Sequence, residues 1–457
     1  MRQLFMVLGL CALTLASPAQ DWFKVKTSGV NPREIGPALT SGRIADLAID
    51  PNNNDRWFIA VASGGVWKTE NHGTTFEPLF DKQGSYSIGC VSLDPNNSNV
   101  VWVGTGENNG QRSVAYGDGV YKSEDGGKSW KNMGLKSSEH IAKIWINPSN
   151  SNEVWVAAQG PLWSSGGERG LFKTTDGGAT WKAVLEVDRH TGISDLVVDP
   201  RLNGVMYASA WQRQRKVWTF ISGGPSSALY ISKDWGNTWS KAANGFPGGE
   251  LGRIGLAISP VNPDRVFAVV EAGKGKKGVY RTDNRGASWT KKSATSTSGN
   301  YYQEIYCDPT NEDIVYIMDT YGLISYKGGA EFERIKEKNK HVDNHALWVN
   351  PNNRMHWIMG CDGGVYETYD EGAQWNFKAN LPVVQFYKIA VDNKKPFYSV
   401  YGGTQDNYSL GGASQTRSSN GIRNSDWFVT NGGDGFQSVV DPTNPDIVYS
   451  QAQYGWL

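Results

Sequence analysis

A turn motif that recurs along the chain limits most strongly how this sequence can fold. Its pattern is Ser/Thr-x-Asp/Asn-x-Gly-x-Ser/Thr-aromatic, with small departures, and copies lie at residues 69–76, 123–130, 174–181, 232–239, 282–289 and 368–375, with a decayed copy at 325–332. In such a turn the acidic side chain accepts backbone N–H groups, the glycine permits positive φ, and the hydroxyl closes the loop. A motif repeated with one internal spacing indicates that the chain is built from equivalent structural units.

A second element precedes each turn and contains an Asp-Pro or related turn followed by a β-branched and aromatic strand. Relatives of this element begin near residues 50, 94, 147, 199, 259, 308, 350, 392 and 441, so the repeat is about 49 residues long. Each unit reads as four short strands, and helical periodicity is absent. The sequence therefore predicts an all-β protein, a many-bladed β-propeller with about nine to ten four-stranded blades.

The two ends of the chain differ from the repeats. Residues 1–19 combine a basic start, an apolar run and small residues before a cleavage position, so we expect a secretory signal peptide and a secreted, periplasmic or extracellular protein. Residues 20–457 carry the propeller with no linker inside it. The ninth unit stops at residue 457 without its third strand, which predicts a propeller truncated in its last blade.

Composition excludes several classes of function. The 45 basic and 45 acidic side chains give zero net charge, which argues against nucleic acid as a partner. No later stretch is apolar enough for a membrane span. After cleavage the cysteines are Cys90, Cys307 and Cys361, an odd and widely spaced set that fits buried thiols better than a disulfide framework.

The repeat resembles the Asp-box (BNR-repeat) β-propellers over nearly the whole mature chain. The segments Gly-Thr-Gly-Glu-Asn-Asn at 104–109, Glu-Arg-Gly-Leu-Phe-Lys-Thr at 168–174, His-Val-Asp-Asn-His-Ala-Leu-Trp at 341–348, Gly-Gly-Thr-Gln-Asp-Asn at 402–407 and Gly-Gly-Asp-Gly at 432–435 are similar to the sortilin-like (vacuolar-sorting-receptor-like) propellers of secreted bacterial proteins. Proteins of this kind are often labelled glycosyl hydrolases. The resemblance implies a binding module that holds a peptide or polysaccharide ligand on its central face.

Loops of a propeller converge on one face, where ligands bind. Mapping the repeat onto that face selects as ligand-binding residues Arg43, Glu107, Arg213, His341, His345, Asp362 and Gln405. Aromatic side chains in or near the same loops could stack on sugars or anchor a peptide, although each is also a candidate for packing between blades: Tyr116, Trp163, Trp211, Trp218, Tyr301, Tyr302 and Tyr387.

The segment His341-Val-Asp343-Asn-His345 precedes a predicted strand. Positions i, i+2 and i+4 of an extended chain point to the same side, so we expect His341, Asp343 and His345 to converge. Three uses remain open, namely hydrogen bonds between loops, a divalent metal site and acid–base chemistry. No metal motif or cofactor motif is present, and the favoured use is loop hydrogen bonding with no cofactor.

Glycoside hydrolysis is the alternative function, in a xyloglucanase-like or sialidase-like form. It requires two carboxylates flanking the scissile bond, and the candidates are Asp343, Asp406 and Asp434, with Asp362 beside them. The resemblance to family 74 xyloglucanases implies an acid in an Asp-x-Gly-Gly context in the first blade. Ala62 begins the corresponding segment here, and the unbroken series of repeats differs from the two seven-bladed propellers of those enzymes. The main prediction is therefore a sortilin-like binding protein.

Overall fold

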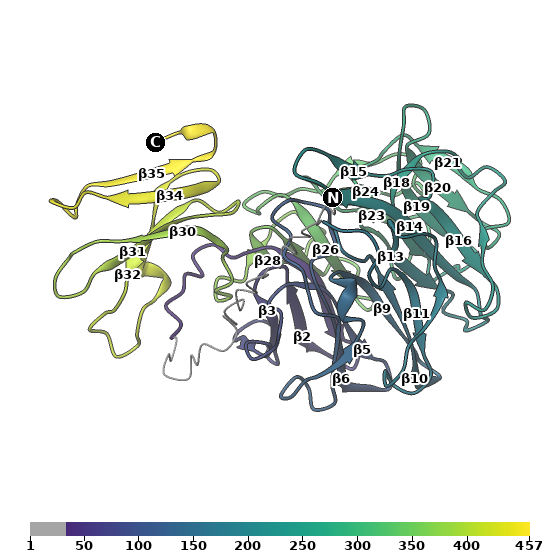
Figure 1. Ribbon diagram of the computed structural model, residues 1–457, viewed down its shortest axis with the longest axis horizontal. Helices are drawn as coiled ribbons and strands as arrows, with labels where there is room; N and C mark the ends of the chain where they lie inside the picture. The colour runs from purple at the N-terminus through teal and green to yellow at the C-terminus, as the bar shows by residue number, and fades with distance from the viewer. Residues whose placement is uncertain (1–32) are drawn as a thin grey trace, which may run out of the picture. The chain divides into compact units, whose positions relative to one another are not determined.

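The computed structural model describes residues 33–457, so the expected signal peptide at 1–19 lies outside the described residues. Residues 36–457 form one compact unit, in which nine antiparallel sheets follow each other along the chain (Figure 1). Eight sheets have four or five strands and the last has two. The prediction of an all-β, many-bladed propeller is confirmed. Among the described residues, no helix is long and apolar enough to cross a membrane.

The first four sheets run from residue 44 to residue 241, with the 3-10 turn η2 (Lys136–Ser138) between the second and third. The first contains β1 (Ile44–Asp50), β2 (Asn53–Val61), β3 (Gly65–Thr69) and β4 (Glu77–Pro78), and the second contains β5 (Ile88–Asp94), β6 (Asn97–Thr105), β7 (Val120–Ser123) and β8 (Lys131–Gly134). The third contains β9 (Ile141–Asn147), β10 (Asn150–Ala158), β11 (Gly170–Thr174) and β12 (Lys182–Leu185), and the fourth contains β13 (Thr191–Val198), β14 (Met206–Arg215), β15 (Phe220–Ser222), β16 (Ala228–Ser232) and β17 (Ser240–Lys241).

The other five sheets run from residue 251 to residue 452. The fifth contains β18 (Leu251–Ile258), β19 (Val266–Ala272), β20 (Gly278–Thr282) and β21 (Thr290–Ser293), the sixth β22 (Ile305–Cys307), β23 (Val315–Ile317), β24 (Leu323–Ser325) and β25 (Glu333–Arg334), and the seventh β26 (Asn344–Val349), β27 (Trp357–Cys361), β28 (Gly364–Thr368) and β29 (Asn376–Phe377). The eighth contains β30 (Phe386–Val391), β31 (Ser399–Thr404), β32 (Ser409–Ala413) and β33 (Trp427–Asn431), and the ninth β34 (Gly435–Val440) and β35 (Val448–Ala452); the short turns η3 (Asn424–Asp426) and η4 (Gln453–Gly455) lie beside them.

The repeated turn forms the hydrogen bonds that its composition predicts. In the second sheet, the Oδ1 atom of Asp125 accepts the backbone N–H of Ser129 at 2.9 Å and the hydroxyl of Ser123 at 2.8 Å. Gly127 has φ of 90° and donates its N–H to the Ser123 hydroxyl. The tryptophan that ends the motif, Trp130, donates its indole N–H to the carbonyl of Leu79 in the neighbouring sheet. The turn therefore stabilises one sheet and fixes it against the next.

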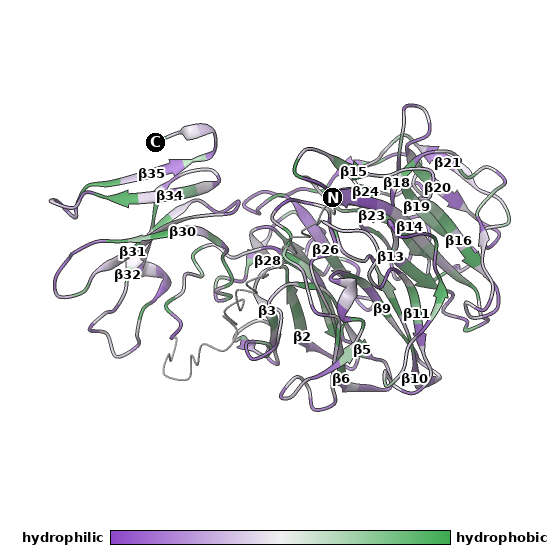
Figure 2. Ribbon diagram, viewed as in Figure 1, coloured by the Kyte–Doolittle hydropathy of each residue, from purple (hydrophilic) through white to green (hydrophobic). Residues whose placement is uncertain are grey.

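Hydrophobic side chains between sheets close the first seven sheets into a ring. Seven clusters of buried residues occur, and each joins two neighbouring sheets. Six of them join consecutive sheets. The seventh joins Ile44 and Ile59 of the first sheet to Ile358 and Val365 of the seventh sheet. Figure 2 shows that hydrophobic segments run along the strands of this ring, while many connecting loops are hydrophilic.

The eighth and ninth sheets pack on each other outside the ring, because β30 and β31 contact β34. Seven of the nine sheets thus form the ring, whereas the repeat alone predicted about nine to ten equivalent blades between residues 20 and 457. The turn motif recurs only as far as residue 375, in the seventh sheet. Closure depends on the side chains that face across from β1 to β26 and β27. The eighth and ninth sheets also leave apolar side chains such as Ile389 (69 % exposed) and Val439 (50 % exposed) on their surfaces.

Closure of the ring can be tested at Ile358, which is fully buried between the first and seventh sheets. Replacing Ile358 with Ala leaves a cavity at this junction, so we expect the free energy of unfolding to fall by about 2–5 kcal/mol. Ile389→Ala in the eighth sheet is the matched control, and it should change stability by less than about 0.5 kcal/mol because that side chain is exposed. Urea denaturation measures both values. Equal effects of the two substitutions would contradict the seven-sheet closure.

Candidate functional site

A buried arginine lies at the centre of the candidate site. Arg43, directly before β1, is 6 % exposed and reaches three carboxylates. Its Nη1 lies 2.7 Å from Glu107 Oε1 and its Nε lies 2.9 Å from Asp362 Oδ1. Its Nη2 lies 3.5 Å from Asp406 Oδ2. Because these acids follow β6, β27 and β31, Arg43 joins the first, second, seventh and eighth sheets at one point.

Asp362 is the most heavily bonded acid of this cluster. It accepts hydrogen bonds from His345 Nε2 at 2.8 Å and from the Tyr301 hydroxyl, in addition to Arg43. Burial alone raises the pKa of a carboxyl group, but the positive charges of Arg43 and His345 more than offset it and hold the pKa of Asp362 well below its usual range. Asp362 is therefore a carboxylate whose oxygens are already occupied by neighbouring side chains.

Asp406 has the opposite behaviour. Burial, together with the negative charge of Asp362 beside it, raises the pKa of Asp406 to about 8, because the attraction of Arg43 is too weak to compensate. Its side chain is 23 % exposed, and its backbone has φ of 62°, which turns it out of the strand β31. The raised pKa favours the protonated form of Asp406 at neutral pH.

Asp406 opens onto a cleft of about 540 Å³ at the point where the ring meets the eighth and ninth sheets. The side chains that line this cleft come from five sheets and are mostly polar: Gln111, Arg112, Ser113, Tyr301, Asp343, Asp362, Tyr387, Gln405, Asp406, Asp434 and Gln453. Four acids thus share one solvent-filled space. Two tyrosines and Arg112 supply the apolar surface and hydrogen-bond donors that a neutral polar ligand needs.

The two remaining cleft acids are held by neighbouring side chains. Asp343 Oδ1 accepts the hydroxyl of Tyr302, and Asp434 Oδ2 accepts the side-chain amide of Gln453. Asp434 also pairs with Tyr408 through its backbone, which fixes the ninth sheet beside the loop that carries Asp406. Burial and the charges of Asp434 and Asp406 raise the pKa of Tyr387 to about 12, so this phenol stays neutral.

The predicted convergence of His341, Asp343 and His345 does not occur. Asp343 has φ of 62°, so the segment is not extended and the strand β26 begins only at Asn344. The His341 ring faces the carbonyl of Val342 at 2.8 Å, and His345 bonds Asp362. A left-handed residue in the middle of the motif breaks the alternation on which the prediction rested. The use of these side chains in loop hydrogen bonds, one of the three left open, is what the contacts show.

Two other predicted ligand-binding residues are buried behind the surface. Arg213 is fully buried and donates to the backbone carbonyls of Asn109 (2.6 Å) and Gly160 (3.2 Å). Glu107 is 1 % exposed and accepts from Arg43 and Asn109. Both side chains therefore hold loops in place and do not line the cleft. The repeat predicts which loops lie on the ligand face, but it does not show whether a side chain in such a loop points outward or back into the protein.

The remaining predictions fall at the cleft. Gln405, Asp343, Asp362, Asp406 and Asp434 line it, and Arg43 and His345 hold Asp362 from behind. Gln111, Ser113 and Gln453 also line the cleft, but no sequence signal distinguished them from ordinary loop residues. Within residues 33–457, the only three side chains that gather His, Cys, Asp or Glu ligand atoms within 4.8 Å are His72, His356 and Glu367, which are not part of this cleft.

Comparison with known proteins finds similarity to curated xyloglucanases. The chain is 24 % identical over 302 residues to an oligoxyloglucan-reducing end-specific xyloglucanase of Emericella nidulans, a match that covers 56 % of this chain and 35 % of the relative. It is 26 % identical over 279 residues to a xyloglucanase of Hypocrea jecorina, covering 54 % of this chain and 30 % of the relative. The chain thus matches about a third of the length of these curated relatives. No family model matches the sequence.

Solved structures support the same fold. An ancestral GH74 enzyme superposes with a TM-score of 0.52 at 17 % identity, covering 92 % of this chain and 67 % of that one. The curated relatives support the predicted glycoside hydrolase alternative better than the predicted sortilin-like binding protein. The ring closes after seven sheets, so the unbroken series of repeats is no argument against a xyloglucanase.

The role of Arg43 can be tested by Arg43→Met. The substitution leaves Glu107 and Asp362 buried with less compensating charge, so we expect it to lower the free energy of unfolding by about 3–5 kcal/mol. Lys327→Met is the control, because Lys327 pairs with Glu331 at the surface and such pairs contribute little to stability. Thermal and urea unfolding measure both variants. A loss at Arg43 no larger than that at Lys327 would show that the cluster does not hold the sheets together.

Proposed function

We propose that this protein is a glycoside hydrolase that cleaves a xyloglucan-like polysaccharide in the cleft between the ring and the eighth sheet. One observation carries the proposal: a cleft rich in carboxyl groups contains one acid, Asp406, that keeps its proton at neutral pH. The similarity to xyloglucanases supports the class of substrate. Secretion, which a polysaccharide substrate would require, rests on the predicted signal peptide.

In the proposed reaction, Asp406 is the general acid. It donates its proton to the glycosidic oxygen as the bond to the anomeric carbon breaks, and the leaving sugar departs as an alcohol. A water molecule forms the new bond to the anomeric carbon, and a second carboxylate acts as the base that takes its proton. Asp362 cannot take this role because it is ionised and bonded to Arg43, His345 and Tyr301. Its negative charge instead keeps the proton on Asp406. Arg43 and Asp362 are therefore positioning residues for the acid.

The second carboxylate comes from Asp343 or Asp434. Both line the cleft, Asp343 from the ring and Asp434 from the start of the ninth sheet. Ala62 at the corresponding first-blade position has no acid to offer, and it is 1 % exposed. Variants of Asp343 and Asp434 distinguish these two candidates.

The assignment of the acid predicts that Asp406→Asn will lower the rate of xyloglucan hydrolysis by about 10²–10⁴-fold, the usual contribution of a general acid. Release of reducing ends from xyloglucan measures the rate. Of Asp343→Asn and Asp434→Asn, the variant that removes the base should show a comparable loss. Asp81→Asn, an exposed acid far from the cleft in sequence, is the control and should leave the rate unchanged. Full activity in Asp406→Asn contradicts the proposal.

The pH dependence gives a second test. A general acid works only while it is protonated, so kcat should fall as the pH rises through the pKa of Asp406, near 8. The alkaline limb of the profile should therefore lie near pH 8. Arg43→Lys keeps the positive charge but cannot contact Glu107, Asp362 and Asp406 together. It should therefore shift the pH at which kcat falls. An alkaline limb that stays in place would assign the titration to another group.

A further inference from the structure

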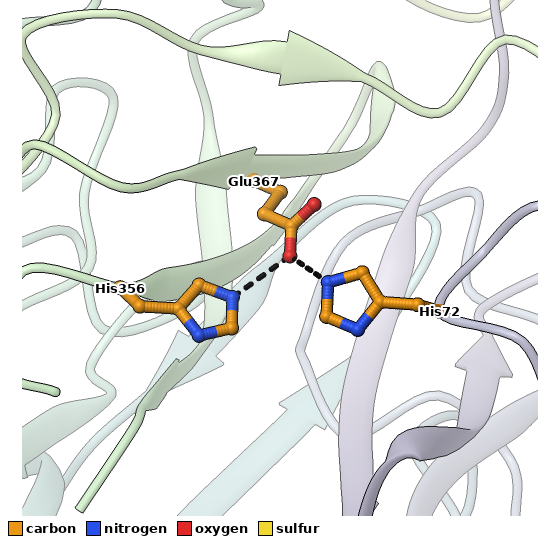
Figure 3. Close-up of side chains that lie close together, drawn as sticks. All are labelled: His72, His356 and Glu367. Carbon is orange, nitrogen blue, oxygen red and sulfur yellow. Dashed lines mark hydrogen bonds and ion pairs between the residues drawn. The ribbon is translucent and has the colours of Figure 1, made fainter. Parts of the chain in front are cut away.

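A group of histidine and carboxylate side chains lies at the junction of the first and seventh sheets, apart from the cleft. His72 sits in the repeated turn between β3 and β4, His356 directly precedes β27, and Glu367 lies in β28. Figure 3 shows both imidazole rings facing the same oxygen of Glu367. His72 Nε2 lies 2.5 Å from Glu367 Oε1, and His356 Nε2 lies 2.8 Å from it.

The hydrogen bonds of His72 show which of its nitrogens carries a proton. Nδ1 lies 3.1 Å from Asp55 Oδ1, and a carboxylate only accepts, so Nδ1 is the donor. In the neutral ring Nε2 then presents a lone pair to Glu367 Oε1, which is also an acceptor. Two acceptors at 2.5 Å need a positive charge between them, either a proton or a metal ion. A proton on His72 Nε2 satisfies this contact, and His356 Nε2 can donate its own proton to the same oxygen. A metal ion instead binds both imidazoles and the carboxylate at once.

The surroundings fit a metal ion. Two imidazoles and one carboxylate form a ligand set typical of zinc, and the Asp55 contact is the kind of carboxylate–histidine bond that orients metal-binding imidazoles. Glu367 Oε2 is held by Lys378 Nζ at 2.8 Å, which leaves Oε1 as the single ligand oxygen. The hydroxyl of Tyr369 lies 2.8 Å from His72 Nε2 and donates to Glu367 Oε1 at 2.9 Å, so it must turn away from that oxygen or become the fourth ligand when the ion binds.

We propose that His72, His356 and Glu367 bind one divalent transition metal ion of the zinc class, which ties the first sheet to the seventh and so secures the ring. Ligand atoms about 2.0–2.1 Å from zinc lie about 3.3 Å apart in a tetrahedron. The observed contacts of 2.5 and 2.8 Å therefore need to open by less than about 1 Å. His72 is on a turn with 26 % of its side chain exposed, which gives the ion a path from solvent.

One contact has to change when the ion binds. Asn350 lies 3.0 Å from His356 Nδ1 through its Nδ2, while its Oδ1 accepts the N–H of Asn352. In this arrangement His356 Nδ1 is the acceptor and Nε2 carries the proton. Metal binding requires the other tautomer, with the proton on Nδ1. Asn350→Asp supplies a carboxylate that accepts this proton and keeps the bond to Asn352, so the substitution should tighten metal binding.

The test uses the full chain, stripped of metal with a chelator and titrated with ZnCl₂ by calorimetry. We expect one Zn²⁺ per chain and a melting temperature that rises with added Zn²⁺. His72 has φ of 61°, a conformation that asparagine also tolerates, so His72→Asn keeps the turn while removing one ligand. It should weaken Zn²⁺ binding by at least about tenfold. Asn350→Asp should strengthen binding by about tenfold or more.

His190→Asn is the matched control, because His190 lies outside the proposed site, and it should bind Zn²⁺ like the parent protein. Absence of stoichiometric binding, or equal affinity in the parent, His72→Asn and Asn350→Asp, would overturn the proposal and leave the group as a proton-bridged contact. Xyloglucan hydrolysis is a separate readout, so failure of the metal site and failure of the hydrolase proposal are distinguishable.

Discussion

The ion cluster around Arg43 is the interaction on which the arrangement of sheets and the chemistry of the cleft both depend. A guanidinium group that is almost fully buried must be compensated, and here the compensation comes from carboxylates of three different sheets. The cluster therefore places the loop of the eighth sheet against the ring. The cluster also gives two neighbouring acids opposite pKa shifts. The pKa of Asp362 is lowered by its contacts with positive charges, whereas the pKa of Asp406 is raised by burial beside Asp362.

Closure after seven sheets is the second constraint. Within the ring, each pair of neighbouring sheets shares one hydrophobic cluster. The cluster between the first and seventh sheets is of the same kind as the other six. Polar side chains then add specificity at that junction. Ser41 donates to the carbonyl of Leu381, and Glu367 receives His72, His356 and Lys378. The eighth and ninth sheets lack the turn motif and pack on each other, and the cleft lies where they meet the ring.

The repeated motif was enough to predict the fold class and the geometry of the turn. Both follow from local rules, since an Asp–Ser/Thr–Gly turn forms its hydrogen bonds within eight residues. The point of ring closure could not be predicted, because it depends on contacts between side chains more than 300 residues apart, such as Ile44 with Ile358.

The candidate site was predicted only in part, because the direction of each side chain depends on contacts that the repeat does not show. Mapping loops to one face found the acids Asp343, Asp406 and Asp434, which line the cleft. It misjudged Arg213, whose side chain turns inward, and the His341–His345 segment, which a left-handed Asp343 interrupts. The proposed metal site at the junction could not be predicted, because His72 comes from the first sheet while His356 and Glu367 come from the seventh, and the three residues form no metal-binding spacing motif.

The proposed acid chemistry depends on Asp406 keeping its proton at neutral pH, which its burial beside the ionised Asp362 favours. The most direct test is infrared difference spectroscopy of the carboxyl stretch, comparing the parent protein with Asp406→Asn across a pH titration. We predict a protonated carboxyl band that depends on Asp406 and disappears with a midpoint near pH 8. A band lost near pH 4, the ordinary range of an aspartic acid, would contradict this account.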